Sequence, residues 1–110
     1  MSEMVLGPFE ESVLAAVFRL RDEAYGVPIM RDLEERLKRR VTVGALYGTL
    51  ERLESKGLLK SRLGEPTPQR GGRSKKFYTL TASGVRTLQA AWKRTRRRWS
   101  GVPAQIHKPA

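Results

Sequence analysis

The chain has 110 residues, no cysteine and a formal net charge of +11. This length fits one domain. The lack of cysteine excludes disulfides, thiolate metal sites and a cysteine nucleophile, and a protein without disulfides fits a reducing cytoplasm. The charge is uneven, because residues 1–54 hold 8 basic and 10 acidic residues whereas residues 55–110 hold 14 basic residues and 1 acidic residue. A half this basic favours nucleic acid or an anionic membrane surface as partner. The longest early apolar run, residues 13–18, is too short to span a bilayer, and no basic region typical of a signal peptide precedes it. We therefore expect a cytoplasmic protein without a membrane partner.

The first predicted helix begins at Pro8, because proline suits the first turn of a helix. Its apolar residues cover about 200° of the helix surface, about twice the stripe that a surface helix usually needs. We interpret this width as two contacts, one with the core of the domain and one with a second chain. The alternative is a helix sandwiched within its own monomer. The residues assigned to the contact between chains are Phe9, Val13 and Val17.

A second helix is predicted from Pro28 to Arg39-Arg40, after a break at Tyr25-Gly26. A third is predicted over residues 43–55, with Thr42 as N-cap and Gly57 as the left-handed residue that ends it. Two helices joined by a short turn are typical of a helix-turn-helix.

The third helix is the candidate for reading DNA, because small and polar residues lie opposite its leucine stripe. A helix fits the major groove. Glycines weaken a helix, so two glycines in this one indicate that a partner approaches its backbone closely. The alternative is an ordinary solvated face. The candidate DNA contacts are Thr42, Gly44, Ala45, Tyr47, Gly48, Thr49 and Arg52.

Residues 58–63 and 76–80 are strand-like, and the segment between them holds two prolines and a Gly-Gly pair. This pattern predicts a β-hairpin, or wing, over residues 58–80. Its cations could follow a phosphate backbone or enter a minor groove, and the alternative is a loop kept soluble by its charge. The candidate DNA contacts are Arg70, Gly71, Gly72, Arg73, Lys75 and Lys76.

A last helix is predicted over residues 82–100, capped by Thr81 or Ser83, with a disordered tail over residues 101–110. Heptad spacing along it favours packing against a second chain. The predicted dimer contacts here are Leu88, Trp92, Thr95 and Trp99.

Two features of this helix leave alternatives open. Trp92 and Trp99 of two subunits could line a pocket for a flat aromatic effector instead of only packing together. We interpret the four arginines Arg94, Arg96, Arg97 and Arg98 as a solvated face, with extra DNA contact as the alternative.

Neither a nucleophile-elbow motif nor a phosphate-binding glycine loop occurs, so we expect no enzyme. The single histidine, His107, lies in the predicted tail without nearby carboxylates, and we expect no metal site and no cofactor.

These elements predict a mainly α fold with a small β-hairpin. It is a winged helix-turn-helix domain over residues 1–81, followed by a dimerisation helix. The sequence resembles the PadR-like family of bacterial transcriptional regulators over roughly residues 6–88. The matching pieces are Tyr25-Gly26, Thr42-Val43-Gly44-Ala45-Leu46-Tyr47, Leu50-Glu51-Arg52-Leu53, Gly57-Leu58-Leu59, Lys76-Phe77-Tyr78-Thr79-Leu80-Thr81 and Gly84.

The resemblance implies a C-terminal helix that dimerises with the first helix of the partner. It also implies repression of nearby genes, often relieved by small aromatic or xenobiotic compounds. Thr42, Gly44 and Tyr47 match the DNA-facing stretch of the family, and Ala45 stands where a hydroxyl residue is common. With one helix after the wing, the chain is similar to the short subfamily.

We therefore expect a homodimeric repressor that binds a pseudo-palindromic site in double-stranded DNA. The first alternative is an architectural or RNA-binding protein that uses charge without base specificity. The second is a protein-interaction module whose wing contacts an acidic partner.

Overall fold

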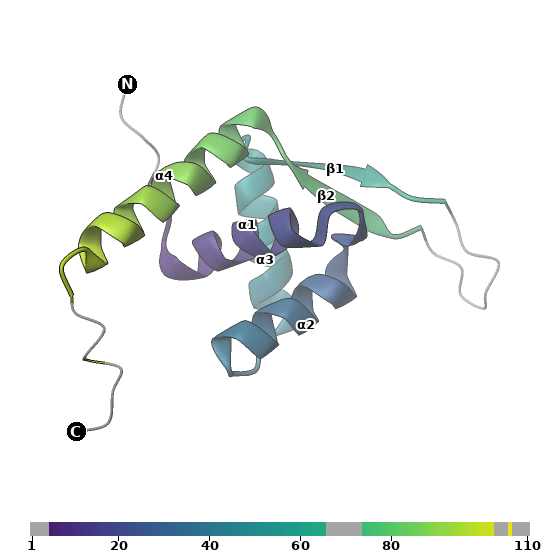
Figure 1. Ribbon diagram of the computed structural model, residues 1–110. Helices are drawn as coiled ribbons and strands as arrows, with labels where there is room; N and C mark the ends of the chain where they lie inside the picture. Colours follow the sequence, from purple (N-terminus) through teal and green to yellow (C-terminus); the bar gives the residue numbers. More distant parts are fainter. Residues whose placement is uncertain (1–4, 66–73, 103–105, 107–110) are drawn as a thin grey trace.

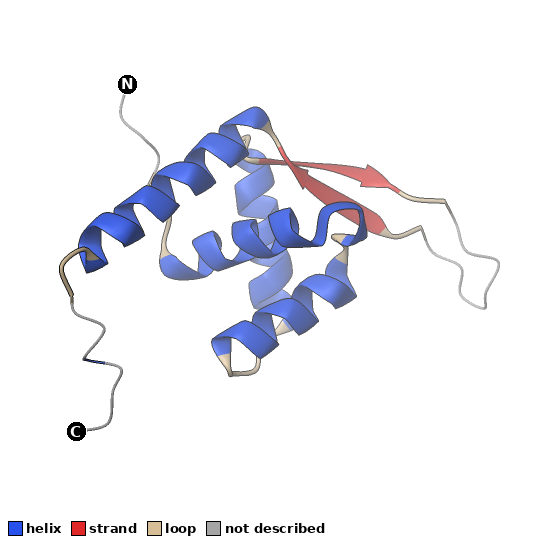
Figure 2. Ribbon diagram, viewed as in Figure 1, coloured by secondary structure: helices blue, strands red, loops and turns tan. Residues whose placement is uncertain are grey.

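The structure, a computed structural model, describes residues 5–65, 74–102 and 106 (Figure 1). In chain order the elements are α1 (Pro8–Leu20), a short 3₁₀ turn (Arg21–Glu23), α2 (Gly26–Leu37), α3 (Val43–Ser55), β1 (Leu59–Leu63), β2 (Lys76–Leu80) and α4 (Ala82–Trp99). Helices make up most of the described chain, and the two strands form one small antiparallel ribbon at its side (Figure 2). The predicted mainly α fold with a β-hairpin is therefore confirmed.

Helix α1 lies at the centre of the molecule and packs against α2, α3, α4 and β2. Its residues Val13, Leu14, Ala16 and Val17 are buried. The prediction that Val13 and Val17 contact a second chain is wrong, because their side chains are 0% and 1% exposed within a single subunit. Most of the wide apolar stripe of α1 is covered by elements of its own chain, as the alternative interpretation expected, whereas Phe18 is 48% exposed.

Helix α3 has the predicted bounds because its caps act as the sequence indicates. The Thr42 side chain accepts a hydrogen bond from the backbone N–H of Ala45 at 3.1 Å. At the other end, Gly57 has a φ of +76°, and the N–H of Leu58 reaches back to the carbonyl of Leu53 at 2.9 Å. This is the bond pattern of a helix closed by a left-handed glycine.

Helix α2 differs from the prediction by two residues at each end. It begins at Gly26, since Pro28 fits within the first turn, where no N–H is required. It ends at Leu37, because Lys38 takes a left-handed conformation with a φ of 56°.

The hairpin pairs Leu59 with Leu80 and Leu63 with Lys76. Tyr78 is buried, and its N–H donates to the carbonyl of Ala24 at 2.9 Å, which fixes the hairpin against the segment before α2. The hairpin therefore projects from a defined place beside the helix-turn-helix.

Helix α4 is capped by Thr81, whose side chain accepts from the N–H of Gly84 at 3.0 Å. Only Gly84 and Ala91 of this helix are buried, so most of α4 has no cover from its own chain. No helix within the described ranges is long and apolar enough to cross a bilayer. Of the tail predicted over residues 101–110, the parts 103–105 and 107–110 lie outside the described residues.

Candidate nucleic-acid interface

The first turn of α3 is open to solvent. Thr42, Val43, Gly44 and Ala45 are all exposed, and a Cβ placed on Gly44 would meet nothing within 4 Å. The side chains of this turn are short, and Val43 borders an open groove that it shares with residues of α2. Base edges in a major groove could therefore come close to the helix backbone here.

Two further predicted contacts on α3 differ, since Thr49 is buried whereas Arg52 is exposed. Thr49 is 1% exposed, so it belongs to the core, and its assignment as a DNA contact is wrong. The Arg52 guanidinium donates to the Thr49 hydroxyl at 2.8 Å and lies 3.5 Å from where a Cβ on Gly48 would stand. Arg52 therefore lies back along the helix, and it covers half-buried Gly48.

The same edge of α3 is tied to the beginning of α1. The ammonium of Lys56 lies 2.8 Å from a carboxylate oxygen of Glu10, and Nε of Arg52 lies 3.9 Å from the same oxygen. The hydrogen bond from Lys56 is the largest cause that holds the pKa of Glu10 below its ordinary value of 4.5. These ion pairs fix the orientation of α3 on α1.

Tyr47 lies on the opposite edge of α3, toward α2 and the hairpin. It is 42% exposed, and together with Gly26, Lys75 and Lys76 it lines an open groove of about 330 Å³. The structure thus brings a predicted contact of the third helix next to two predicted contacts of the wing.

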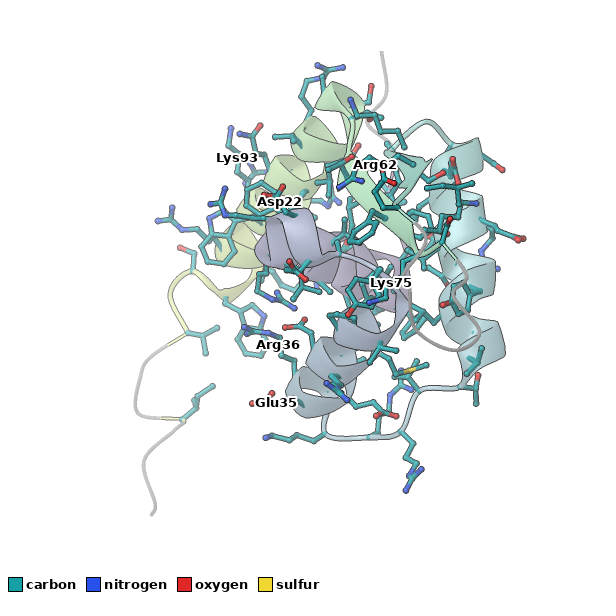
Figure 3. The ribbon with its side chains drawn as sticks, turned by 90° about the vertical axis from the view of Figure 1, so that its right-hand side faces the viewer. Asp22, Glu35, Arg36, Arg62, Lys75 and Lys93 are labelled. Atoms are coloured by element: carbon teal, nitrogen blue, oxygen red, sulfur yellow. The ribbon has the colours of Figure 1, made fainter. Side chains whose placement is uncertain are left out.

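The end of the two strands next to the loop, which we call the hairpin base, carries a stack of rings and cations. Lys75 Nζ lies 4.5 Å from the ring centroid of Tyr25, the rings of Tyr25 and Phe77 meet edge to face at 5.2 Å, and the Arg62 guanidinium lies 4.7 Å from the Phe77 ring. Figure 3 looks onto this end of the molecule and labels Arg62 and Lys75. Such contacts are worth about 0.5–1 kcal/mol each at exposed sites, so they orient the hairpin base.

Sequence reasoning missed Arg62, Tyr25 and Phe77 as parts of this surface. Arg62 had a usable signal, since it is a cation in the strand that leads into the wing. Tyr25 and Phe77 had none, because their contact joins residues far apart in the chain.

The predicted tip of the wing, Arg70, Gly71, Gly72 and Arg73, lies outside the described residues. Of the wing cations that the structure describes, Lys75 and Lys76 are exposed. Lys76 Nζ lies 3.9 Å from the carboxylate of Glu54, which also accepts a hydrogen bond from Ser61 at 2.7 Å.

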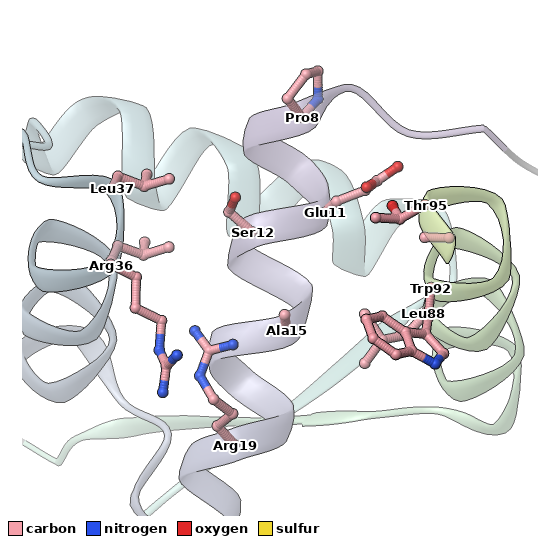
Figure 4. Close-up of a pocket in the computed structure, with 12 residues that line it drawn as sticks. Pro8, Glu11, Ser12, Ala15, Arg19, Arg36, Leu37, Leu88, Trp92 and Thr95 are labelled. Carbon is pink, nitrogen blue, oxygen red and sulfur yellow. The ribbon is translucent and has the colours of Figure 1, made fainter. Parts of the chain in front are cut away.

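The five remaining predicted dimer contacts fall into two groups. Phe9 and Leu88 are partly buried against the core of their own chain, whereas Trp92, Thr95 and Trp99 are exposed, the two tryptophans by 61% and 55%. Leu88, Trp92 and Thr95 line a groove of about 380 Å³. Helix α1 forms the floor of this groove, and α2 and α4 lie on its two sides (Figure 4). Trp99 does not line this groove.

A charged cluster closes the α2 side of this groove. Arg19 and Arg36 both donate to the carboxylate of Asp32, and Figure 4 shows the two arginines side by side. Burial alone would raise the pKa of Asp32, but these hydrogen bonds outweigh it and hold the pKa below its ordinary value of 3.8. Arg94 of α4 reaches Glu11 of α1 at 3.8 Å on the other side.

Known structures share this arrangement. A PadR family transcription regulator from Clostridium difficile has 28% sequence identity and a TM-score of 0.66, over 93% of this chain and 100% of that one. RosR from H. salinarum has 26% identity and a TM-score of 0.70, over 91% of this chain and 83% of that one. A PadR-like transcription factor from Bacteroides fragilis, 24% identical over 86% of this chain and 89% of that one, has the same fold with a TM-score of 0.65. Among curated proteins no sequence is a significant match.

A family model also matches the sequence, and its description is the transcriptional regulator PadR-like family. The match covers residues 13–90, which include α2, α3, both strands and the first half of α4. The fold is that of a DNA-binding transcriptional regulator, and the chain belongs to the PadR-like family.

Proposed function

We propose that this protein is a transcriptional repressor that binds a pseudo-palindromic operator in duplex DNA as a homodimer. The observation that carries the proposal is the exposed first turn of α3, whose Gly44 has no neighbour, with the cationic base of the hairpin at its side. A bare helix turn suits base readout in the major groove, and lysines suit the phosphates that flank it.

The contacts divide into two kinds. Thr42, Gly44 and Ala45 would meet base edges or let the backbone approach them, since they are short and exposed. Tyr47, Lys75 and Lys76 would meet phosphates, which fix the register without reading the sequence. Gly48 would lie behind this surface, and Arg70 and Arg73, predicted from the sequence as further contacts, lie outside the described residues.

Dimerisation through α4 is supported by its lack of cover. The apolar side chains of Trp92 and Trp99 are exposed on a helix that buries only two residues in its own chain. Large exposed apolar side chains on one helix are typical of a protein interface. A partner's α4 that packs along the exposed face of this helix would bury both tryptophans, and two-fold symmetry would then place two α3 helices about one DNA turn apart, or a multiple of it.

Release by an effector is the regulatory part of the proposal. Trp92 and Trp99 of two subunits would form the walls of a site for a flat aromatic compound. Planar aromatics should quench the tryptophan fluorescence of the dimer. An unchanged spectrum across a broad panel of such compounds would remove this part.

The test is a mobility-shift titration on the DNA upstream of the protein's own gene, with unrelated duplex as competitor. We expect a shift that unrelated DNA does not compete away and that weakens steeply with salt. Lys75→Ala should weaken binding, whereas Lys93→Ala, an equal change of charge on α4, should not. Equal competition by unrelated DNA would instead favour an architectural protein. An Arg73→Ala/Lys76→Ala variant that binds DNA as tightly as the wild type would instead favour a protein-interaction module.

A further inference from the structure

The beginning of α2 touches the side chain of Tyr47 in an unusual way. A Cβ built on Gly26, the first residue of α2, would lie 2.0 Å from the Tyr47 hydroxyl oxygen and 3.1 Å from Cζ. The end of the phenol therefore occupies the space that any other residue at position 26 would need for its side chain.

The backbone of Gly26 does not explain the glycine. Gly57 and Gly101 have positive φ values, whereas Gly26 does not, and it stands in the first turn of a helix. Glycine is a poorer helix residue than alanine. The contact with Tyr47 is therefore the feature of the structure that requires glycine here.

The obstacle at Gly26 differs from the obstacle at Gly84. At Gly84 a Cβ would strike the backbone carbonyl of Leu58, which the fold holds in place. At Gly26 it would strike the free end of a side chain, which can rotate away. A side chain on residue 26 should therefore leave the fold intact and displace Tyr47.

The position of the Tyr47 hydroxyl is relevant to DNA binding because polar and cationic residues of the hairpin lie beside it. Its phenol lines the groove between α2, α3 and the hairpin base, together with Ser74, Lys75 and Lys76. The hydroxyl residues Tyr47 and Ser74 and the lysines Lys75 and Lys76 thus border one open groove, and the Lys76 ammonium also lies 3.9 Å from the Glu54 carboxylate. Hydroxyl donors and positive charge match the acceptor oxygens and negative charge of a phosphodiester.

We propose that Gly26 is a positioning residue for DNA binding. Because it has no side chain, it leaves the space that the Tyr47 hydroxyl occupies in this groove, and there the hydroxyl donates to a backbone phosphate beside Lys75. This inference rests on the proposed function, since it assumes that duplex DNA occupies the groove.

The test is a double-mutant cycle of Gly26→Ala and Tyr47→Phe, with affinity measured on the duplex that the wild-type protein shifts. A hydrogen bond to a charged group is worth roughly tenfold in affinity, so each single variant should bind about tenfold more weakly. Gly26→Ala should add less than about twofold in the Tyr47→Phe background, because the hydroxyl it would displace is already absent. Gly7→Ala is the matched control: Gly7 precedes α1 directly, as N-cap, and a Cβ there meets nothing within 4 Å. This control should bind like the wild type.

Two further readouts separate positioning from a structural role. The slope of log affinity against log salt should stay that of the wild type in Gly26→Ala, since Tyr47 is neutral, and should fall by about 1 in Lys75→Ala. The urea midpoint of Gly26→Ala should match that of the wild type. A midpoint that falls in proportion to the affinity, or costs that add in the double variant, would overturn the role of Gly26. A wild-type protein that shifts no duplex would refute DNA binding itself, which is a separate outcome.

Discussion

Gly84 offers the sharpest test of how α4 is attached to the winged domain. In Gly84→Ala the new Cβ would lie 2.1 Å from the Leu58 carbonyl oxygen. That oxygen also accepts the N–H of Thr81 at 3.0 Å, and the Thr81 hydroxyl donates to the carbonyl of Gly57 at 2.6 Å. The methyl group therefore cannot be accommodated unless the beginning of α4 moves away from the end of α3.

The cost follows from these contacts. Overpacking costs about 1–3 kcal/mol, a weakened hydrogen bond adds about 1 kcal/mol, and the better helix propensity of alanine returns at most about 1 kcal/mol. We expect a net loss of about 1–3 kcal/mol in the free energy of unfolding. At a typical urea dependence this lowers the midpoint by about 1 M.

The measurement is urea unfolding followed by circular dichroism, at one protein concentration because an oligomer would make the midpoint depend on it. Gly44→Ala is the matched control: it also adds a methyl group in the first turn of a helix, but into open space. It should be as stable as the wild type or more stable by up to about 1 kcal/mol. A Gly84→Ala protein that unfolds together with the Gly44→Ala protein would refute the steric argument.

Three further predictions concern other parts of the molecule. Trp92→Asp should give a monomer in sedimentation, because it places a charge in the proposed α4 interface. The control Gln89→Asp, on the same helix, should remain a dimer. A Trp92→Asp protein that is still a dimer would place the interface elsewhere. Glu10→Gln should lower the urea midpoint at neutral pH. The difference from the wild type should disappear as pH falls below about 4.5, because a carboxylate with a lowered pKa stabilises the fold only while it is ionised. A difference that does not depend on pH would exclude the ion pair with Lys56 as its cause. Lys38→Gly should raise the unfolding free energy by about 1 kcal/mol, because a lysine is held at a φ of 56°; a lower urea midpoint would contradict this.

Local signals predicted the helix-turn-helix well. The Thr42 cap and the Gly57 closure act within a few residues of the chain, so the bounds of α3 could be deduced from residue types alone. The strands and α4 were predictable for the same reason. At the beginning of α2 the proline signal gave a start two residues late, because proline is tolerated anywhere in a first turn.

Interactions between distant segments could not be predicted in this way. The burial of Val13, Val17 and Thr49 depends on which elements surround α1 and α3, and helical spacing reports only which residues share a face. The direction of Arg52 depends on Glu10, which lies on another helix. The contact of Tyr47 with Gly26 likewise exists only once α2 and α3 are packed together.

The central place of α1 decides which surfaces remain for partners. Since α2, α3, α4 and β2 all pack on it, α1 offers a second chain the floor of the groove beside Trp92 and, near its end, the 48% exposed Phe18. Helix α4, in contrast, has cover mainly near its beginning, and its residues from Thr95 to Trp99 are all exposed. The proposed dimer through α4 would therefore take its apolar contact mainly from Trp92 and Trp99. Loss of Trp92 should then cost more dimer stability than loss of any one residue of α1.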